Sequence, residues 1–246
     1  MTQVRIGTSG WVYKHWTSGL FYPPKLPSRQ QLAFYTQYFD TVEINYSYYQ
    51  LPERSAFQTW RSTVPNNFVF AVKASRYLTH MKKLKDPAEP LERFFERASA
   101  LEDCFGPVLF QFPKQWRINL PRLEAFLEAL CAYPGHRWTF EFRHPTWLVD
   151  EVYRLLGRSN AALCQPVGWG VPLDVRLTAD WTYIRFHAGQ HGTGFEDAEL
   201  RPWAERIRAY AKRNIDSYCY FNNDSLWHGR PAAIDDARRL LDMVQA

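Results

Sequence analysis

Short segments of apolar and β-branched residues recur along the chain, and most are separated by segments of helical period. Short strands that alternate with helices indicate βαβ units and a parallel sheet. The eight segments that we predict as strands are Val4–Thr8, Thr41–Tyr46, Val69–Ser75, Pro107–Phe112, Trp138–Arg143, Ala161–Gln165, Thr182–His187 and Tyr218–Asn222.

Four segments between and after these strands carry apolar residues at spacings of three and four, which is typical of a helix packed on a sheet. They lie at 91–101, 120–130, 200–210 and 234–241. Asn119 is placed to cap the second helix, and Pro121 is tolerable in its first turn. Between the sixth and seventh strands, Gly168, Gly170 and Pro172 interrupt any helical pattern, so we expect an irregular connection there.

Eight parallel strands in one domain can close into a barrel or form an open, doubly wound sheet. The open sheet would place a glycine-rich phosphate turn of the form G-x-G-x-x-G after its first strand. The segment Gly7-Thr8-Ser9-Gly10-Trp11 lacks that spacing, and 246 residues is close to the usual size of an eight-fold α/β barrel. We therefore predict an α/β fold, a single TIM-type (β/α)₈ barrel that occupies residues 1–246.

Composition narrows the class of protein. A hydrophobic fraction of 46% excludes a disordered chain. No segment approaches the roughly 18 to 20 apolar residues that a membrane span needs, and the start of the chain does not resemble a signal peptide. We expect a cytoplasmic protein without a membrane partner. Four scattered cysteines without a C-x-x-C pair predict reduced core thiols, at Cys104, Cys131, Cys164 and Cys219.

Three predicted strands end in two polar residues that flank one apolar residue. Positions i and i+2 of a strand share a face, so both polar side chains can point toward the barrel axis. Charges inside a parallel sheet are costly unless they are paired or hydrated, and the carboxyl ends of barrel strands form the active-site face. The three motifs are Glu43-Ile44-Asn45, Glu141-Phe142-Arg143 and Arg185-Phe186-His187.

Single polar residues at equivalent places extend this set. Lys73 and Gln111 end the third and fourth strands, and His80 and His144 lie just beyond the third and fifth. The eighth strand runs into Asn222, Asn223 and Asp224. A glycine-rich stretch at 189–194 follows the seventh strand, where barrels often bind phosphate through loop amides.

The cations of this set suit a phosphate or carboxylate, to which arginine offers bidentate contacts. A net charge of +5 and a pI near 9.0 favour anionic partners in general. Glu43 or Glu141 beside His187, with His80 near, would supply acid–base catalysis. These patterns favour an enzyme of hydrolase, lyase or isomerase type with a small anionic substrate. The alternative is that the charges are mutual salt bridges that only hold the barrel mouth together.

A metal site is a second alternative, because the set contains ligand types for a divalent ion. However, no H-x-H, H-E-x-x-H or carboxylate triad of recognisable spacing is present. Lys73, Arg143 and Arg185 would also repel a cation. We predict no cofactor. The ligand types in question are Glu43, Glu141, His80, His144, His187 and Asp224.

Aromatic residues make up 17% of the chain, and several follow the first two strands. Trp11 and Tyr46 are the rings that we place in the site, since rings in loops can stack on sugars or bases. Together with the basic pI, they motivate a second hypothesis, a nucleic-acid-binding protein or an endonuclease IV-like nuclease, whose binding would depend strongly on salt.

A set of short motifs runs through nearly the whole chain. They are Gly7-Thr8-Ser9-Gly10-Trp11, Phe21-Tyr22-Pro23, Glu43-Ile44-Asn45, Phe70-Ala71-Val72-Lys73-Ala74, Thr79-His80, Leu109-Phe110-Gln111-Phe112-Pro113, Glu141-Phe142-Arg143-His144, Arg185-Phe186-His187 and Phe221-Asn222-Asn223-Asp224. In this order they resemble the motifs of the YecE-like proteins, a bacterial and archaeal family described as a domain of unknown function. The resemblance implies a TIM barrel and no established reaction; a looser similarity to endonuclease IV and xylose isomerase barrels implies handling of nucleic acid. Ala188 and the segment 165–169 depart from the family pattern.

Overall fold

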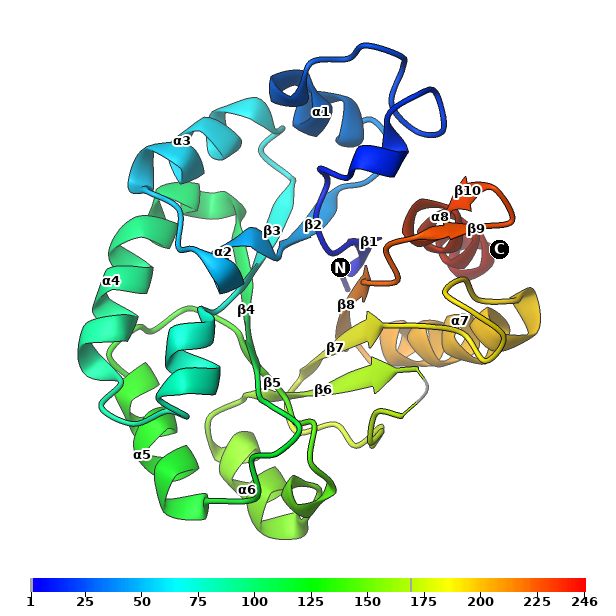
Figure 1. Ribbon diagram of the computed structural model, residues 1–246. Coiled ribbons are helices and arrows are strands. Elements are labelled where there is room, and N and C mark those ends of the chain that lie inside the picture. Colours follow the sequence, from blue (N-terminus) through cyan, green and yellow to red (C-terminus); the bar gives the residue numbers. More distant parts are fainter. Residues whose placement is uncertain (1, 169) are drawn as a thin grey trace.

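The computed structural model describes residues 2–168 and 170–246. Its centre is an eight-stranded parallel sheet in the order β1-β8-β7-β6-β5-β4-β3-β2, curled into a barrel with helices on its outside (Figure 1). The predicted (β/α)₈ architecture is therefore confirmed. The strands are β1 Val4–Thr8, β2 Thr41–Ile44, β3 Val69–Lys73, β4 Phe105–Gln111, β5 Trp138–Glu141, β6 Ala162–Val167, β7 Trp181–Phe186 and β8 Asp216–Phe221.

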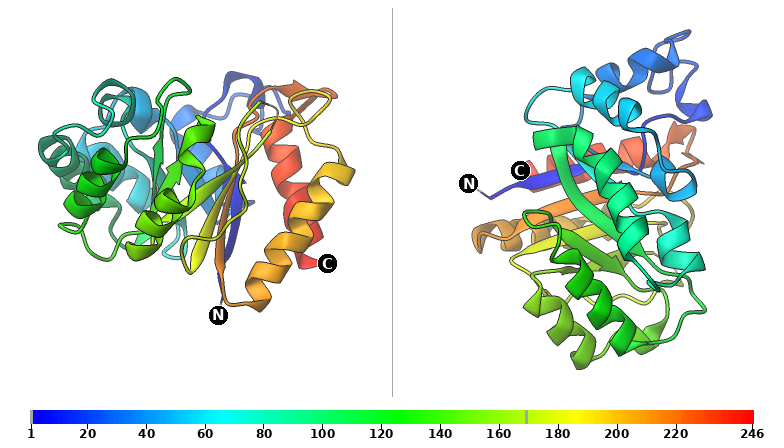
Figure 2. Two further views of the ribbon diagram at one scale, coloured as in Figure 1. Left: turned by 90° about the horizontal axis from the view of Figure 1, so that it is seen from below. Right: turned by 90° about the vertical axis from the view of Figure 1, so that its left-hand side faces the viewer.

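The helices form an outer layer on both flanks of the strands (Figure 2). Asn119 caps α5 as predicted, because its side-chain oxygen accepts a hydrogen bond from the backbone N–H of Arg122 at 3.1 Å. A short hairpin of β9 Leu226–Trp227 and β10 Arg230–Pro231 precedes the last helix. The helices are α1 Ser28–Tyr35, α2 Tyr46–Tyr49, α3 Arg54–Thr63, α4 Ala88–Ala98, α5 Leu120–Leu130, α6 Asp150–Arg158, α7 Asp197–Lys212 and α8 Ala232–Gln245.

The connection from β6 to β7 is irregular, as predicted: residues 170–180 contain no helix. Every other interval between consecutive strands contributes at least one α-helix to the outer layer. None of the helices in the described part of the chain combines the length and apolar character that crossing a bilayer requires.

Strands β1 and β2 form the two ends of the hydrogen-bonded order, and a tyrosine joins them. The Tyr35 hydroxyl accepts a hydrogen bond from the Thr8 backbone N–H at 3.0 Å and donates one to the Thr41 carbonyl at 3.1 Å. A Cβ atom on Gly7 would lie 2.3 Å from the same Thr41 carbonyl oxygen. Glycine at position 7 and the Tyr35 hydroxyl therefore let the barrel close at this seam.

Side chains alternate along the strands between the helix layer and the barrel interior. In β7, Ile184 and Phe186 belong to the main apolar core, whereas Trp181 and Tyr183 join a smaller cluster inside the barrel. Because a strand has period two, Arg185 lies on the same side as Tyr183. The smaller cluster also contains Ala71, Leu109, Ala162, Cys164, Tyr218 and Tyr220.

Two expectations need correction. Cys104, Cys164 and Cys219 are buried, but Cys131 is exposed. It follows Leu130, the last buried residue of α5, and one further residue turns the helix by about 100°, toward solvent. The predicted ends of β2, β3, β4, β5, β7 and β8 also ran past the observed ones, whereas β6 extends two residues beyond its predicted end at Gln165. Several polar residues lie just beyond the last paired residue; these are Asn45, Arg143, His187 and Asn222.

Candidate functional site

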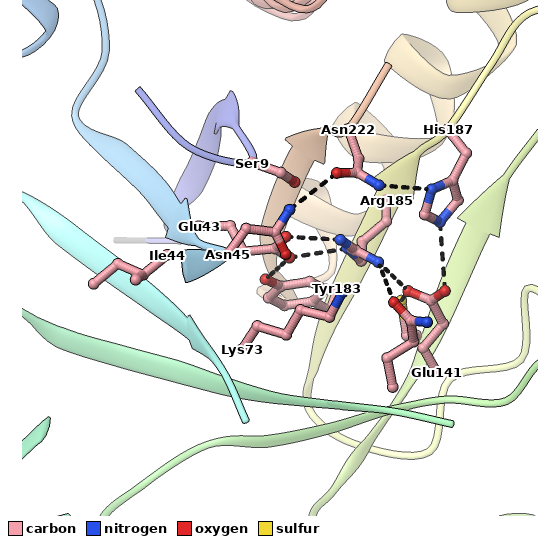
Figure 3. A network of polar contacts seen from close by, with 12 residues as sticks. Ser9, Glu43, Ile44, Asn45, Lys73, Glu141, Tyr183, Arg185, His187 and Asn222 are labelled. Carbon is pink, nitrogen blue, oxygen red and sulfur yellow. Dashed lines mark hydrogen bonds and ion pairs between the residues drawn. The ribbon is translucent and has the colours of Figure 1, made fainter. Parts of the chain in front are cut away.

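The two carboxylates and the arginine from the strand-end motifs meet in one buried ionic cluster (Figure 3). Arg185 of β7 donates from Nε and Nη2 to the two oxygens of Glu43 of β2, at 2.9 and 2.8 Å. Its Nη1 donates to Glu141 Oε2 of β5 at 2.7 Å. All three side chains are completely buried. The predicted convergence of distant segments on the barrel axis is therefore observed.

Two neutral side chains complete the cluster. The Tyr183 hydroxyl donates to Glu43 Oε2 at 2.7 Å, and Arg185 Nη1 also lies 3.3 Å from Gln111 Oε1. Burial by itself would raise the pKa of Glu43, but the charges of Arg185 and Lys73 outweigh it and hold that pKa below its ordinary value. Both carboxylates are thus ionised at neutral pH, since burial likewise opposes ionisation of Glu141 but Arg185 and His187 hold its pKa well below the ordinary value.

A second, partly accessible layer lies above this cluster. Arg143 Nε is in ion-pair contact with Glu141 Oε1, and its Nη2 lies 3.0 Å from His187 Nε2. His187 Nε2 is also 3.4 Å from Glu141 Oε1. The side chains of Arg143 and His187 are 11% and 12% exposed, whereas those of Glu43, Glu141 and Arg185 are inaccessible. A ligand therefore meets Arg143 and His187 before any buried charge.

Donor and acceptor counting defines the tautomer of His187. A guanidinium can only donate, so His187 Nε2 must accept from Arg143, and the ring proton of a neutral His187 lies on Nδ1. The Asn222 amide nitrogen lies 3.2 Å from Nδ1, and Asn45 Nδ2 donates to Asn222 Oδ1 at 3.1 Å. The count closes when both side-chain amides are rotated by 180°, so that Asn222 presents its oxygen to Nδ1 and its NH₂ to Asn45 Oδ1, which is otherwise without a partner among the described residues.

Burial lowers the pKa of His187 more strongly than Glu141 raises it, so this imidazole is neutral at pH 7. Asn222, Asn45 and Arg143 fix the ring in one orientation, with an unprotonated Nε2 toward Glu141 and Arg143. An imidazole held in a single tautomer can accept a proton at that atom.

Lys73 reaches the same cluster from the end of β3 (Figure 3). Its side chain is 7% exposed, and its Nζ lies 4.2 Å from the centre of the Tyr48 ring. His80 packs edge-on against that ring, with 5.1 Å between ring centres. Burial, with the nearby charge of Lys73, lowers the pKa of His80 to about 4, so His80 is also neutral at pH 7.

The structure places the remaining predicted site residues differently. His144 caps a short 3₁₀ helix, Pro145–Trp147, because its Nδ1 accepts from the Thr146 backbone N–H at 3.2 Å. Asn223 donates to Asp236 at 2.6 Å and so connects the end of β8 to α8.

Asp224 belongs to a separate pair. It contacts His15 Nε2 at 2.9 Å, and burial is the main reason why its pKa rises to about 6. Among the described residues, no group of three or more His, Cys, Asp and Glu side chains is arranged to hold a metal ion.

The two predicted rings also fall outside the cluster. Trp11 is buried edge-on against Trp60 and Phe70, with ring centres 5.2 and 6.3 Å away, so it belongs to the apolar core. Tyr46 is 56% exposed on α2 and donates its hydroxyl to Gln50 at 3.1 Å. Tyr48, two residues later, is the ring that contacts Lys73.

One backbone amide of the glycine-rich loop after β7 is already bound by a carboxylate of the protein. The Gln190 and Glu196 backbone N–H groups each donate at 2.8 Å to the carboxylate of Glu199, in the first turn of α7. Cβ atoms on Gly192 and Gly194 would lie 2.0 and 2.1 Å from the Trp227 ring. Gly192 and Gly194 are therefore needed for close packing against Trp227. The Glu199 carboxylate accepts from the Gln190 amide, which a phosphate could otherwise bind.

Sequence reasoning missed Tyr183, although the pattern contained a signal for it. Tyr183 precedes Arg185 by two positions, the same spacing as in the three strand-end motifs, and so shares its face. The role of Tyr35 at the barrel seam left no comparable signal, because the residue lies on a helix and acts on two strands.

The fold and the strand-end charges define a TIM-barrel protein with an ionic cluster at the carboxyl ends of its strands. The family model described as "Protein of unknown function DUF72" matches residues 5–246, so the chain belongs to this family. It is similar to the UPF0759 protein YunF of Bacillus subtilis, with 24% identity over 98% of this chain and 94% of YunF. It is also similar to the UPF0759 protein YecE of Escherichia coli K12, with 30% identity over 46% of this chain and 42% of YecE. The predicted membership of the YecE-like family is confirmed.

Solved structures agree with the fold. A DUF72 family protein from Thermotoga maritima has a TM-score of 0.81 and 28% identity, covering 99% of this chain and 100% of that chain. A DUF72 family protein from Enterococcus faecalis V583 has a TM-score of 0.80 and 17% identity, covering 99% and 96%. The names of these relatives state no reaction and no ligand.

Proposed function

We propose that this protein is an enzyme that acts on a small substrate carrying a phosphate or carboxylate group, at the carboxyl-terminal face of the barrel. The observation that carries the proposal is the layering of charge. A fully buried Glu43–Arg185–Glu141 cluster supports a partly exposed Arg143 and a neutral, oriented His187. A purely structural set of salt bridges does not require this second layer.

Arg143 is the residue that we propose to bind the anionic group. Its Nε and Nη2 are engaged with Glu141 and His187, but within residues 2–168 and 170–246 no hydrogen bond or ion pair engages its Nη1. The contact with Glu141 holds the guanidinium in place, so little side-chain entropy is lost when an anion binds. The side chains that line the same end of the barrel and can contact the rest of a substrate are Asn45, Lys73, Gln111 and Asn222.

His187 is the residue that we propose to transfer a proton. Its Nε2 is unprotonated at neutral pH, lies beside the anion-binding Arg143 and is 3.4 Å from Glu141, which can stabilise the imidazolium that forms. His80 is neutral for the same physical reason and packs against the Tyr48 ring that Lys73 contacts, but its pKa of about 4 makes it a weak base.

Glu43 and Glu141 have a supporting role in this proposal. Both oxygens of Glu43 already accept hydrogen bonds, and its lowered pKa makes it a weak base. Glu141 is shared between Arg185 and Arg143. The carboxylates that looked like acid–base groups in the sequence therefore orient the cations.

A thermal-shift screen of inorganic phosphate, sugar phosphates, nucleotides and dicarboxylates tests the proposal. A true ligand at about 100 times its Kd raises the unfolding temperature by about 5 to 10 °C, and Arg143→Ala abolishes that shift. Arg117→Ala is the control, because Arg117 is exposed and follows β4 at the same end of the barrel. The proposal would be contradicted if no compound class raised the unfolding temperature and Arg143→Ala behaved like the wild type in the same screen.

Nucleic-acid binding is the second candidate, and one surface feature favours it. Tyr46, Tyr49 and Tyr77 are exposed at 56%, 71% and 45%. The Lys82 ammonium lies 5.6 Å from the centre of the Tyr77 ring, and Lys83 and Lys85 follow. Titration of labelled single- and double-stranded oligonucleotides at two salt concentrations tests this idea. No binding even at low salt would end it.

A further inference from the structure

Lys73 differs from the other cations of the cluster because no carboxylate of the described residues is in ion-pair contact with its ammonium. Arg185 contacts two carboxylates and Arg143 contacts one. In the part of the chain that the structure describes, no hydrogen bond or ion pair engages Lys73 Nζ, and its contact is the face of the Tyr48 ring. A buried ammonium without acceptors is costly, so such a lysine favours its neutral amine form.

Charged groups surround Lys73 from four elements. Burial is the largest cause that lowers its pKa, to about 7, and Arg185 and Arg143 act in the same direction. Glu43 and Glu141 oppose this shift without overcoming it. At neutral pH about half of the Lys73 side chains therefore carry a free electron pair on nitrogen. The groups concerned are Glu43 on β2, Glu141 on β5 with Arg143 just beyond it, Arg185 on β7, and His80 after β3.

The ring contact also holds the amine at the end of its strand. Ser47, the residue before Tyr48 in α2, donates its hydroxyl to the Lys73 carbonyl at 2.6 Å. That bond fixes α2 against the end of β3, so the Tyr48 ring lies next to the Lys73 side chain. The Lys73 side chain thereby points toward the Arg185 cluster (Figure 3), where the charge of Arg143 also acts on it.

We propose that Lys73 is a nucleophilic amine that forms a Schiff base with the carbonyl carbon of a small aldehyde or ketone, whose anionic group Arg143 binds. This inference rests on the proposed function and narrows its substrate to carbonyl compounds. A lysine that is desolvated next to other cations is a recognised form of activated amine nucleophile.

Formation of the Schiff base at Lys73 needs no oxidant or reductant. The Lys73 nitrogen pair forms a C–N bond with the carbonyl carbon, and the C=O π pair moves to oxygen, which takes a proton. The nitrogen loses a proton to water. The carbinolamine hydroxyl then takes a second proton and leaves as water, while the remaining nitrogen pair forms the C=N bond. The sum is amine plus carbonyl giving iminium and water after uptake of one proton.

His80 is a neutral hydrogen-bond acceptor, and its pKa of about 4 makes it a weak base, so the proton that nitrogen loses passes to water. Thr79 Oγ1 donates to the Ser75 carbonyl at 3.1 Å, so it accepts from His80 Nδ1 at 2.9 Å. His80 Nε2 is then the unprotonated atom, and His80 and Lys73 contact the same Tyr48 ring. His187, on the Arg143 side, remains available for the proton transfers that follow.

Reductive trapping tests this inference on the whole protein. Pyruvate, glyceraldehyde 3-phosphate or pyridoxal 5′-phosphate is mixed with the protein and sodium borohydride, whose hydride reduces C=N to a stable secondary amine. Peptide mass mapping then locates the adduct. We expect Lys73 to be labelled at least about tenfold faster than the surface lysines at pH 7, with a midpoint near pH 7. Inorganic phosphate in excess should slow the labelling of Lys73 alone.

Variants provide the controls. Lys73→Met should abolish the adduct at this position, and Lys114→Met, which alters an exposed lysine after β4, should leave it unchanged. The adduct is mapped in the wild-type protein, so the test does not depend on how Lys73→Met affects folding. Labelling spread evenly over the lysines, while Arg143-dependent phosphate binding persists, would overturn the Schiff base and leave the proposed function standing. Loss of both would overturn both.

Discussion

The two ends of the barrel each contain an arginine inside the ring of strands, and they use it differently. At the amino-terminal end, Arg137 donates to Asp216 and to the Tyr218 hydroxyl, both at 2.7 Å. This is one cation with one carboxylate, stacked 5.5 Å from the Trp181 ring. At the carboxyl-terminal end, Arg185 holds two carboxylates, and Arg143, His187 and Lys73 lie beside them.

This difference distinguishes a structural ion pair at the amino-terminal end from a candidate ligand site at the carboxyl-terminal end. At the amino-terminal end, the charges of Arg137 and Asp216 balance, and each has its partner. The other end contains more donors than its carboxylates can satisfy, with one arginine nitrogen and one ammonium lacking an acceptor among the described residues. In TIM barrels the amino-terminal face contributes to stability, and the carboxyl-terminal face contains the active site. Four predictions test whether this contrast is real.

The largest effect is expected from Arg185→Met. It leaves Glu43 and Glu141 buried without their shared cation, so we expect a loss of about 3 to 5 kcal/mol in the free energy of unfolding. Arg137→Met is the matched change at the other end, where partial exposure limits the loss to about 1 kcal/mol. Urea unfolding measures both. Equal losses at the two ends would remove the contrast.

Lys73→Met should raise the free energy of unfolding at pH 7, by about 2 to 4 kcal/mol. The Lys73 pKa of about 7 lies below its unfolded value of about 10.4, so the native state binds fewer protons in this window. Wild-type stability therefore rises from pH 7 to pH 10 through this group, and the variant lacks that rise. Urea unfolding across this range measures the gap, which should shrink as pH increases. A gap that stays constant would show that Lys73 is not desolvated.

Tyr183→Phe removes one hydrogen bond to the buried Glu43 carboxylate. We expect a loss of about 1.5 to 3 kcal/mol, because hydrogen bonds to charged groups contribute that much. Tyr218→Phe removes the hydroxyl that accepts from Arg137, and its expected cost is smaller, about 0.5 to 1.5 kcal/mol, because Arg137 is 37% exposed and water can replace the lost bond. Thermal unfolding of the two variants gives the comparison. A Tyr218→Phe loss as large as that of Tyr183→Phe would contradict the ranking.

Among the changes at the carboxyl-terminal end, Arg143→Ala should change stability least, by about 1 to 2 kcal/mol, because Glu141 loses one of its two arginine partners but keeps Arg185. Its effect should appear in ligand response, where the stabilisation by a bound anion is lost. Differential scanning fluorimetry with and without inorganic phosphate measures both quantities together. A large loss of stability with an intact phosphate response would assign Arg143 to the structural ion pairs.

The sequence by itself determined the fold and the location of the candidate site. Local periodicity is written in consecutive residues, so eight strands and the helix of residues 120–130 could be predicted before any contact was known. Period two also placed Glu43, Glu141 and Arg185 on the interior face. The final residue of a strand was less predictable, because pairing with neighbours, and not residue type, decides where a strand ends.

Only the tertiary structure decided which of these groups are partners. Glu43 and Arg185 are 142 residues apart, and no local pattern shows that barrel closure brings them to 2.8 Å. The same closure placed the Lys73 ammonium against the Tyr48 ring, with no carboxylate of the described residues in ion-pair contact. It also brought the Glu199 carboxylate to the Gln190 amide of the glycine loop and buried Trp11 in the core. Burial and pairing are properties of the whole barrel, and they determine whether each charge serves stability or remains free for a ligand.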